Sequence, residues 1–163
     1  MNKTPATDAM WQAFCAATGV TGDYVAERFG DSPEMADELI GLVLAGTKRA
    51  TAGLARYYAP HTNEPLPKVG DHVVACDGQG TPRCIWRTTD LRIGPFDSVD
   101  AAFAWDEGEG DRTLAWWRDA HRRFFERAAA QEGFAFHDGI TTIFERFTIV
   151  WPLEVSDDRA PRG

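Results

Sequence analysis

The sequence predicts an α+β fold, a small β-barrel of mostly antiparallel strands with helices packed around it. Two segments with helical spacing of apolar residues come first, and a β-hairpin signal follows in the middle of the chain. A helical insert then separates the hairpin from a long β-branched and aromatic segment near the C-terminus. A parallel sheet built from alternating βαβ units would contradict this prediction.

Two helices are expected before the first strand. Thr7 or Asp8 can cap a helix that runs to about Ala17. The second helix begins at residues 32–34, where a serine, a proline and a glutamate supply a capping hydroxyl, a favoured first residue and a negative charge near the positive end. Gly46 suits the C-terminal cap of this helix.

Besides the strand that follows the segment of residues 46–51, three β-strands are expected. His72–Cys76 and residues 83–93 form a hairpin around the turn at residues 77–80. Residues 140–151 form a further strand, because they are rich in β-branched and aromatic side chains. Together these strands supply the antiparallel part of the predicted barrel.

The helical insert is expected to contain a short helix over residues 99–105, an acidic loop over residues 106–111 and a longer helix from about Leu114 to Gln131. Asp111 or Thr113 can cap the longer helix. His121 lies on its apolar stripe, as either a hydrogen-bonded core residue or a substrate contact. The other faces carry arginines that are expected to be solvated: Arg112, Arg118, Arg122, Arg123 and Arg127.

Composition limits the classes of function. The hydrophobic content of 44% and charged content of 26% are typical of one globular domain. The net charge of -8 disfavours loose binding to nucleic acid but permits a local basic patch. No apolar run reaches the about 18 residues of a membrane span, and the N-terminus lacks a signal-peptide core. We therefore expect a cytoplasmic protein that does not bind membranes.

The cysteines and histidines predict neither a disulfide framework nor a metal site. Three cysteines form an odd set whose spacing matches no zinc or redox motif, so reduced, partly buried thiols are expected. The four histidines are scattered, with no H-x-x-x-H pair. No metal and no other cofactor is expected.

Residues 46–51 carry the candidate chemistry, because they place Lys48 three residues before Thr51 at a helix-to-strand junction. A lysine with a lowered pKa could take the proton of the hydroxyl in acyl transfer. The alternative is that these two residues are ordinary solvated side chains. In a regular strand they would point to opposite faces, so they meet only if the chain turns or bulges near Gly46.

Together these residues resemble the ASCH domain family, a branch of the PUA-like β-barrels. The family signature G-x-K-x-x-T appears as Gly46, Lys48 and Thr51. The basic residue usual just after the threonine is absent, and Arg49 and Arg56 are the nearest substitutes. The turn at residues 69–71 and the acidic stretch before the aromatic helix also match, so the resemblance covers residues 29–151. It implies an ASCH domain over residues 29–153, which leaves residues 1–28 as an N-terminal helical extension. The polar residues 154–163 are expected to form a disordered tail.

The resemblance implies RNA binding, RNA cleavage or hydrolysis of an acylated nucleoside. The small amidohydrolases of this family have a lysine, a threonine and a glutamate as their proposed catalytic set. Lys48 and Thr51 match the first two, and Glu107 or Glu109 can supply the glutamate. Glu109 is preferred, because its distance from Leu114 better fits the family pattern of a glutamate shortly before the helix.

The base of such a reaction is left open by the sequence. A free lysine with a pKa near ~10.4 is a poor base, and burial or a neighbouring cation such as Arg49 would have to lower that pKa. A carboxylate beside Lys48 would raise it instead. In that case Glu109 would be the base, and Lys48 would stabilise a developing oxyanion.

Three classes of function follow, and the first expectation is a hydrolase of a small modified nucleoside, since the acidic net charge suits a small substrate. Tyr57, Trp105 and His121 are its candidate substrate contacts. The second class is an RNA-binding or RNA-cleaving module, with Lys48, Arg49, Arg56 and the arginines of the longer helix on the phosphates. The third is a non-catalytic sensor of a nucleotide-like ligand. No oligomeric state follows from the sequence.

Overall fold

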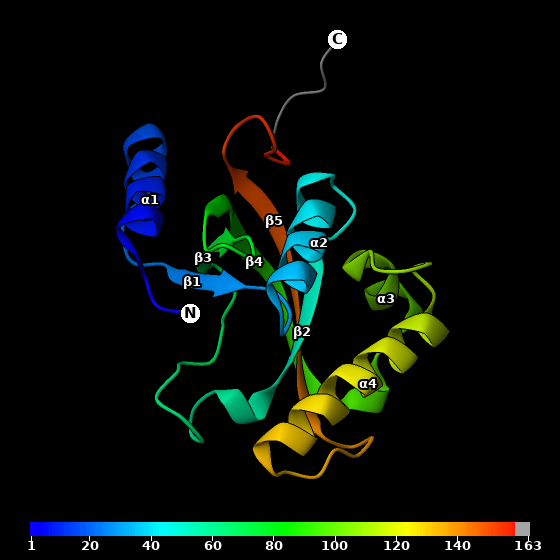
Figure 1. Cartoon of the computed structure of the whole chain (residues 1–163). Helices are drawn as coiled ribbons and strands as arrows, with labels where there is room; N and C mark the ends of the chain where they lie inside the picture. The colour runs from blue at the N-terminus through cyan, green and yellow to red at the C-terminus, as the bar shows by residue number, and fades with distance from the viewer. Residues whose placement is uncertain (159–163) are drawn as a thin grey trace. The chain divides into compact units, whose positions relative to one another are not determined.

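The structure is a computed structural model that describes residues 1–158 (Figure 1). These residues form two compact units. Unit 1 contains Met1–Gly46, Lys68–Asp90 and the chain from Phe147 onward, and unit 2 contains Thr47–Pro67 and Leu91–Arg146. Residues 159–163 of the predicted tail lie outside the described residues.

The strands form one five-stranded sheet in the order β1-β3-β4-β5-β2. β1 runs parallel to β3, whereas the β3/β4 and β2/β5 pairs are antiparallel. This confirms the predicted α+β class, with an open, mixed sheet whose edge strands are β1 and β2. The elements are α1 (Pro5–Thr18), β1 (Val25–Arg28), α2 (Pro33–Leu44), β2 (Ala50–Leu54), η1 (Ala55–Tyr57), β3 (His72–Cys76), β4 (Pro82–Pro95), η2 (Phe96–Ser98), α3 (Ala101–Glu107), α4 (Leu114–Glu132) and β5 (Thr141–Trp151).

Both predicted N-terminal helices are present in unit 1. α1 begins earlier than predicted, because Thr4 rather than Thr7 or Asp8 is its cap, with Pro5 at the first helical position. The Thr4 hydroxyl accepts from the backbone of Thr7, and the Thr7 side chain accepts from the backbone of Thr4. α2 begins after Ser32 as predicted. Gly46 follows α2 with φ of 89°, a conformation that favours glycine.

β1 was not predicted from the sequence. It has four residues, of which only Ala26 is buried, so it carries no readable alternation. Its pairing with β3 sets Val25 opposite Val73, and this parallel ladder depends on residues far apart in the chain. The predicted N-terminal extension therefore includes a strand of the sheet.

The core of unit 1 is aromatic. Trp86 of β4 stacks on Phe29 at 5.4 Å and on Phe147 at 4.6 Å between ring centroids. Trp11 and Phe14 of α1 pack in a second cluster of the same unit. All three cysteines of the chain lie in this unit as free thiols, as expected.

β2 and β5 pair in unit 2 and divide their side chains between two faces. Ala50 and Leu54 of β2 are buried in an apolar cluster with Phe103 of α3 and Trp117 of α4. Because side chains alternate along a strand, Thr51 faces the side opposite to Ala50.

The helices of unit 2 differ from the prediction at one point that matters for the site. α3 starts after the cap Asp100 and ends at Glu107, so Glu107 is a helical residue and not part of the acidic loop. α4 starts after Thr113, one of the two predicted caps. Arg112 precedes α4 instead of lying on its face, and its φ is 65°.

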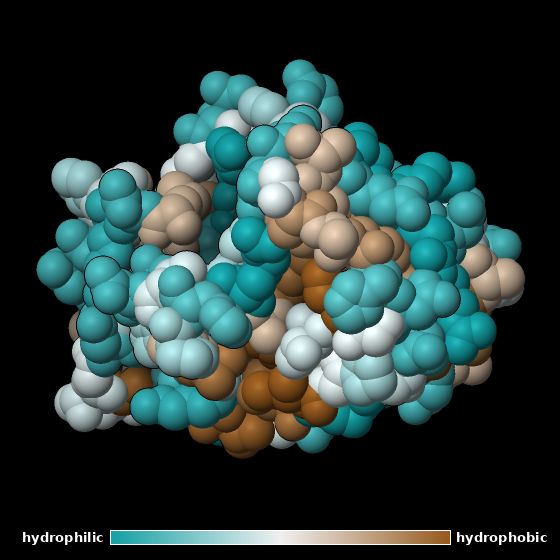
Figure 2. All heavy atoms as spheres, turned by 90° about the horizontal axis from the view of Figure 1, so that it is seen from below, coloured by the Kyte–Doolittle hydropathy of each residue, from teal (hydrophilic) through white to brown (hydrophobic). Residues whose placement is uncertain are grey.

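The surface seen in Figure 2 is mostly hydrophilic, with apolar patches between the polar residues. Trp105 is one of the most exposed large apolar side chains of the described residues, at 57%. Within residues 1–158, no helix combines the length and the apolar character needed to cross a membrane.

Candidate functional site

A buried ion-pair network in unit 2 is the candidate functional site. The Lys48 ammonium donates to Glu107 Oε1 at 2.9 Å and to Glu109 Oε1 at 2.7 Å. The side chains of Lys48 and Glu107 are each 1% exposed, whereas that of Glu109 is 14% exposed. A charge buried this deeply is retained only when an opposite charge and hydrogen bonds compensate for lost hydration.

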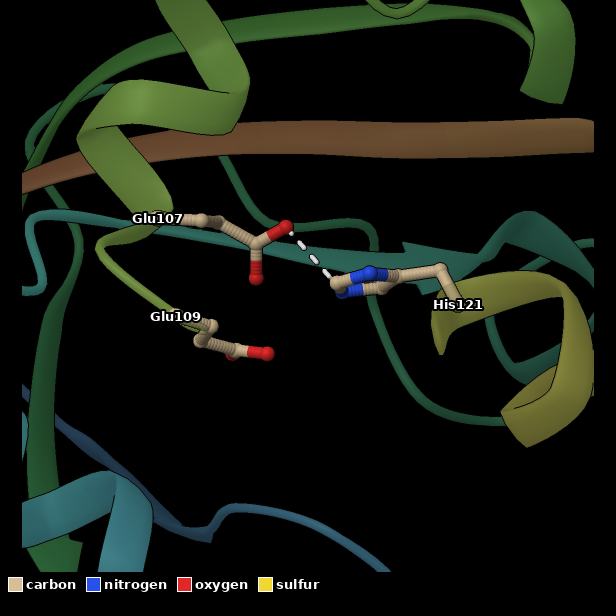
Figure 3. Close-up of side chains that lie close together, drawn as sticks. All are labelled: Glu107, Glu109 and His121. Carbon is tan, nitrogen blue, oxygen red and sulfur yellow. Dashed lines mark ion pairs between the residues drawn. The ribbon is translucent and has the colours of Figure 1, made fainter. Parts of the chain in front are cut away.

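The second oxygen of Glu107 is also occupied. Glu107 Oε2 accepts a hydrogen bond from the indole nitrogen of Trp117 and lies 3.1 Å from Nε2 of His121. Figure 3 shows the Glu107 carboxylate pointing towards the His121 ring, with Glu109 on the loop that follows α3. Glu107 is thus held from three sides. Lys48, Glu107, Glu109 and His121 are called the ion-pair network below.

α4 fixes the orientation of His121. Trp117 and His121 are four residues apart on the helix, so they lie on the same face, and their rings stack at 4.0 Å with an angle of 12°. The other ring nitrogen, Nδ1, lies 2.9 Å from the backbone oxygen of Trp117. Of the two alternatives for His121, the structure shows a buried histidine whose two nitrogens both have partners.

Backbone contacts hold Lys48 against the end of α3. The Arg49 amide donates to the Asp106 carbonyl at 2.7 Å. Gly108 ends α3 with φ of 70°, and a Cβ there would lie 2.3 Å from the Thr47 carbonyl oxygen. Only glycine therefore permits this close approach of the two chain segments. The Lys48 side chain is delivered to both glutamates by this junction.

The charges of the network determine its protonation. Burial alone would lower the pKa of Lys48, but the carboxylates of Glu107 and Glu109 outweigh burial and raise it. Burial alone would raise the pKa of Glu107, but His121 and Lys48 hold it well below its usual range. Burial alone would lower the pKa of His121, but Glu107 above all raises it. The neighbouring charges therefore favour the charged forms of Lys48, Glu107 and His121 over the effect of burial.

Thr51 lies outside this network. Among the contacts of residues 1–158, no hydrogen bond joins its hydroxyl to Lys48, Glu107 or Glu109. It stands directly opposite Glu145 of β5, so these two side chains share one face, with Cβ atoms about 5 Å apart. Glu145 is buried, and the sequence reading missed it. No local signal singles it out, because β5 also carries Arg146 and several threonines.

The other predicted binding residues lie in separate contacts. The Arg49 guanidinium donates to the Lys48 carbonyl at 2.7 Å. Arg56 lies 3.6 Å over the ring of Phe134. The Tyr57 hydroxyl donates to Glu132 at 2.9 Å, and burial together with Glu132 raises the pKa of Tyr57 to about 12.

Trp105 is exposed and carries the Arg112 guanidinium 3.8 Å over its ring. Arg112 also donates to the Trp105 carbonyl through Nε and a terminal nitrogen. Arg56, Tyr57 and Trp105 thus contact Phe134, Glu132 and Arg112, none of which belongs to the network.

The network also contains a group with the residue types of a metal site. Glu107, Glu109 and His121 each offer a ligand atom, and these atoms lie within 4.8 Å of one another. The set fits a metal ion poorly, because the Lys48 ammonium already bridges both carboxylates. Moreover, both ring nitrogens of His121 face hydrogen-bond acceptors, so neither presents a lone pair to an ion.

The fold and the site define an α+β domain with a mostly antiparallel sheet, flanking helices and a buried lysine–glutamate–histidine network. Residues 25–151 match the family model of the ASCH domain. The chain therefore belongs to the ASCH domain family, and the resemblance read from the sequence is confirmed.

Two solved structures are similar to this chain over most of its length. The ASCH domain from Lactobacillus crispatus JV V101 is 28% identical, with a TM-score of 0.81 over 91% of this chain and 96% of that one. A protein from Enterococcus faecalis V583, assigned to the family DUF984, is 32% identical, with a TM-score of 0.80 over 89% of this chain and 88% of that one. No match was found among curated proteins.

Proposed function

We propose that this ASCH domain is a hydrolase that cleaves the amide bond of a small acylated nucleoside or a related substrate. Glu109 is the general base, and Lys48 stabilises the developing oxyanion. The observation that carries this proposal is the Lys48 ammonium held between one fully buried carboxylate and one that is partly exposed.

The two glutamates have different tasks because their surroundings differ. Glu107 has partners at both oxygens and is buried, so it anchors Lys48. Glu109 has a hydrogen bond to Lys48 at Oε1, and its Oε2 has no hydrogen bond among the described residues. That oxygen is placed to accept a proton from a water molecule. Glu109 is therefore the carboxylate that reacts.

The protonation state of Lys48 supports this division. The raised pKa keeps Lys48 charged at neutral pH, so it cannot serve as the base. A charged ammonium with its position fixed can instead stabilise negative charge on the carbonyl oxygen of the substrate. This is the arrangement expected when a carboxylate lies beside Lys48.

The reaction is a direct attack of water on the amide carbon. Glu109 takes a proton from the water as its oxygen bonds to carbon, and Lys48 stabilises the oxyanion. The carbon–nitrogen bond then breaks, and the proton on Glu109 passes to the leaving amine, giving a carboxylic acid and a free amine. General base catalysis of this kind contributes about 10² to 10⁴ in rate.

The proposal is tested with a panel of amide-acylated nucleosides, measured by release of the free acid. Wild-type protein is expected to hydrolyse at least one of them, and Glu109→Gln to lose about 10² to 10⁴ in kcat. Glu126→Gln, an exposed position on α4, is the matched control. Acid release from no substrate, or full activity of Glu109→Gln, would contradict the proposal.

RNA binding has weaker support, because arginines near α4 already have acidic partners. Arg122 pairs with Asp138, and Arg123 pairs with Asp119. These pairs reduce the positive charge that could follow a phosphate backbone. A salt titration of binding to single-stranded RNA distinguishes the two functions, since a phosphate contact gives affinity that falls steeply with salt.

A further inference from the structure

Three hydrogen-bond donors converge on the buried Glu107 carboxylate. The Lys48 ammonium donates to Oε1, and the indole nitrogen of Trp117 donates to Oε2. The third neighbour is Nε2 of His121, 3.1 Å from Oε2. An ammonium and an indole nitrogen can only donate, so the carboxylate is best satisfied when it is ionised and the imidazole also donates.

The opposite side of the His121 ring fixes its second proton. Nδ1 lies 2.9 Å from the Trp117 carbonyl oxygen, which can only accept. Nδ1 must therefore carry a hydrogen. With Nε2 donating to Glu107, both ring nitrogens are protonated and His121 is a cation. The stack on Trp117 prevents the ring from turning away from these two acceptors.

We propose that His121 is a positioning residue: as a doubly protonated imidazolium it shares the Glu107 carboxylate, so that Lys48 remains available to Glu109 and to the substrate oxygen. The proposal deepens the proposed function, and only its kinetic test rests on that function. Every titratable group that faces His121 belongs to the network: Glu107 from α3, Glu109 from the following loop and Lys48 from the segment before β2.

The charge balance explains why an imidazole would be kept at this position. With His121 charged, two cations face two anions. With His121 neutral, Lys48 alone would face both carboxylates, and its charge would be more fully neutralised by them. Oxyanion stabilisation by Lys48 then weakens, although His121 touches no substrate. As pH rises and His121 loses its proton, the activity of the network falls.

The protonation is tested directly by NMR of the imidazole nitrogens in the wild-type protein. At about pH 7.5, above the ordinary histidine pKa of about 6.5, we expect both nitrogens of His121 to carry hydrogens. The nitrogen signals that disappear in the His121→Gln variant are those of His121. His137 is an exposed histidine, so the His137→Gln variant is the control and should remove only the signals of His137. One unprotonated nitrogen of His121 at this pH would overturn the proposal.

The positioning role is tested by the pH profile of kcat/KM. Wild type is expected to lose activity on the alkaline side as His121 deprotonates. The His121→Gln variant keeps a neutral hydrogen-bond donor but loses the positive charge. We expect its kcat/KM at neutral pH to be about tenfold lower, the effect of losing one charge-assisted hydrogen bond. Its pH profile should also lack the alkaline decrease of the wild type. A variant with the wild-type rate and an identical profile would overturn the proposal. If wild type hydrolyses no substrate, the proposed function fails, and the NMR result alone decides the state of His121.

Discussion

The two units bury different kinds of polar side chain. Among the described residues, unit 1 buries no Lys, Arg, His, Asp or Glu side chain, and its buried polar residues are Thr7, Thr88 and Ser156. Unit 2 buries Lys48, Glu107, His121 and Glu145. The comparison separates a unit that is packed for stability from a unit that retains charges in its interior.

The difference is informative because buried ion pairs are a poor means of stabilisation. Replacing such a pair with apolar residues of similar volume is often neutral or stabilising by about 1–4 kcal/mol. The interior of unit 1 is filled by apolar side chains instead, with Trp86 stacked between Phe29 and Phe147. The retention of the network in unit 2 therefore points to a task other than folding.

The largest effect is expected from Lys48→Met. The substitution leaves Glu107 and Glu109 without their shared cation, and breaking a buried pair from one side costs about 3–5 kcal/mol of folding free energy. Denaturant unfolding measures this loss. Lys68→Met, at an exposed lysine, should change stability little and serves as the control. If the Lys48→Met variant were as stable as the wild type, the claim that Glu107 and Glu109 depend on the Lys48 charge in the folded state would be contradicted.

A smaller loss is expected from Phe147→Leu in unit 1. It removes part of the stack on Trp86 and should cost about 1–2 kcal/mol, as core truncations commonly do. Because the lost contact is one between apolar rings, the loss should be nearly the same at acid and alkaline pH. A strongly pH-dependent loss would show that the units are not as different as their buried side chains indicate.

The pH dependence of stability sharpens the comparison further. The folded state raises the pKa of His121, so the stabilisation by its charge is fully present below about pH 6.5, its unfolded value, and is lost as pH rises through the folded pKa. The folded state lowers the pKa of Glu107, so its contribution persists to low pH and is lost only below its ordinary range. The unfolding free energies of wild type and His121→Gln should therefore converge on the alkaline side. A constant difference over the whole pH range would contradict a charged His121.

The smallest effect is expected from Thr51→Ala. Water is the nucleophile in the proposed reaction, so loss of this hydroxyl removes at most one neutral substrate contact and lowers kcat/KM by about tenfold or less. Thr51→Ser should retain the wild-type rate. Loss of nearly all turnover in the alanine variant, with turnover retained in the serine variant, would instead make Thr51 the nucleophile.

Local signals explain the elements that the sequence predicted well. The Ser32 cap, the β3–β4 turn and the β-branched run of β5 all act within a few residues, so they can be read directly. β1 could not be read, because a strand of four residues gains its pairing from β3. The end of α3 was misplaced although Gly108 is a local C-terminal cap signal, because Asp106 and Glu107 were assigned to the acidic loop.

The site was predictable only in part. Family resemblance selected Lys48 and Glu109, and the structure joins them by an ion pair. The anchoring of Glu107 by Trp117 and His121 could not be read, because it depends on the angle at which α3 and α4 pack. Glu145 was missed because its place opposite Thr51 follows from the register between β2 and β5. The sequence does not specify this register for two strands that lie so far apart in the chain.

The most direct test of the division between the two glutamates is a paired measurement of kcat/KM and melting temperature in Glu107→Gln and Glu109→Gln. In the proposed reaction the partly exposed Glu109 is the base, so its variant should lose about 10² or more in kcat/KM while the melting temperature stays close to that of wild type. Glu107 is the buried anchor, so its variant should lose melting temperature as well as activity. The reverse pattern, with Glu107→Gln inactive but fully stable and Glu109→Gln active, would contradict the assignment of Glu109 as the base.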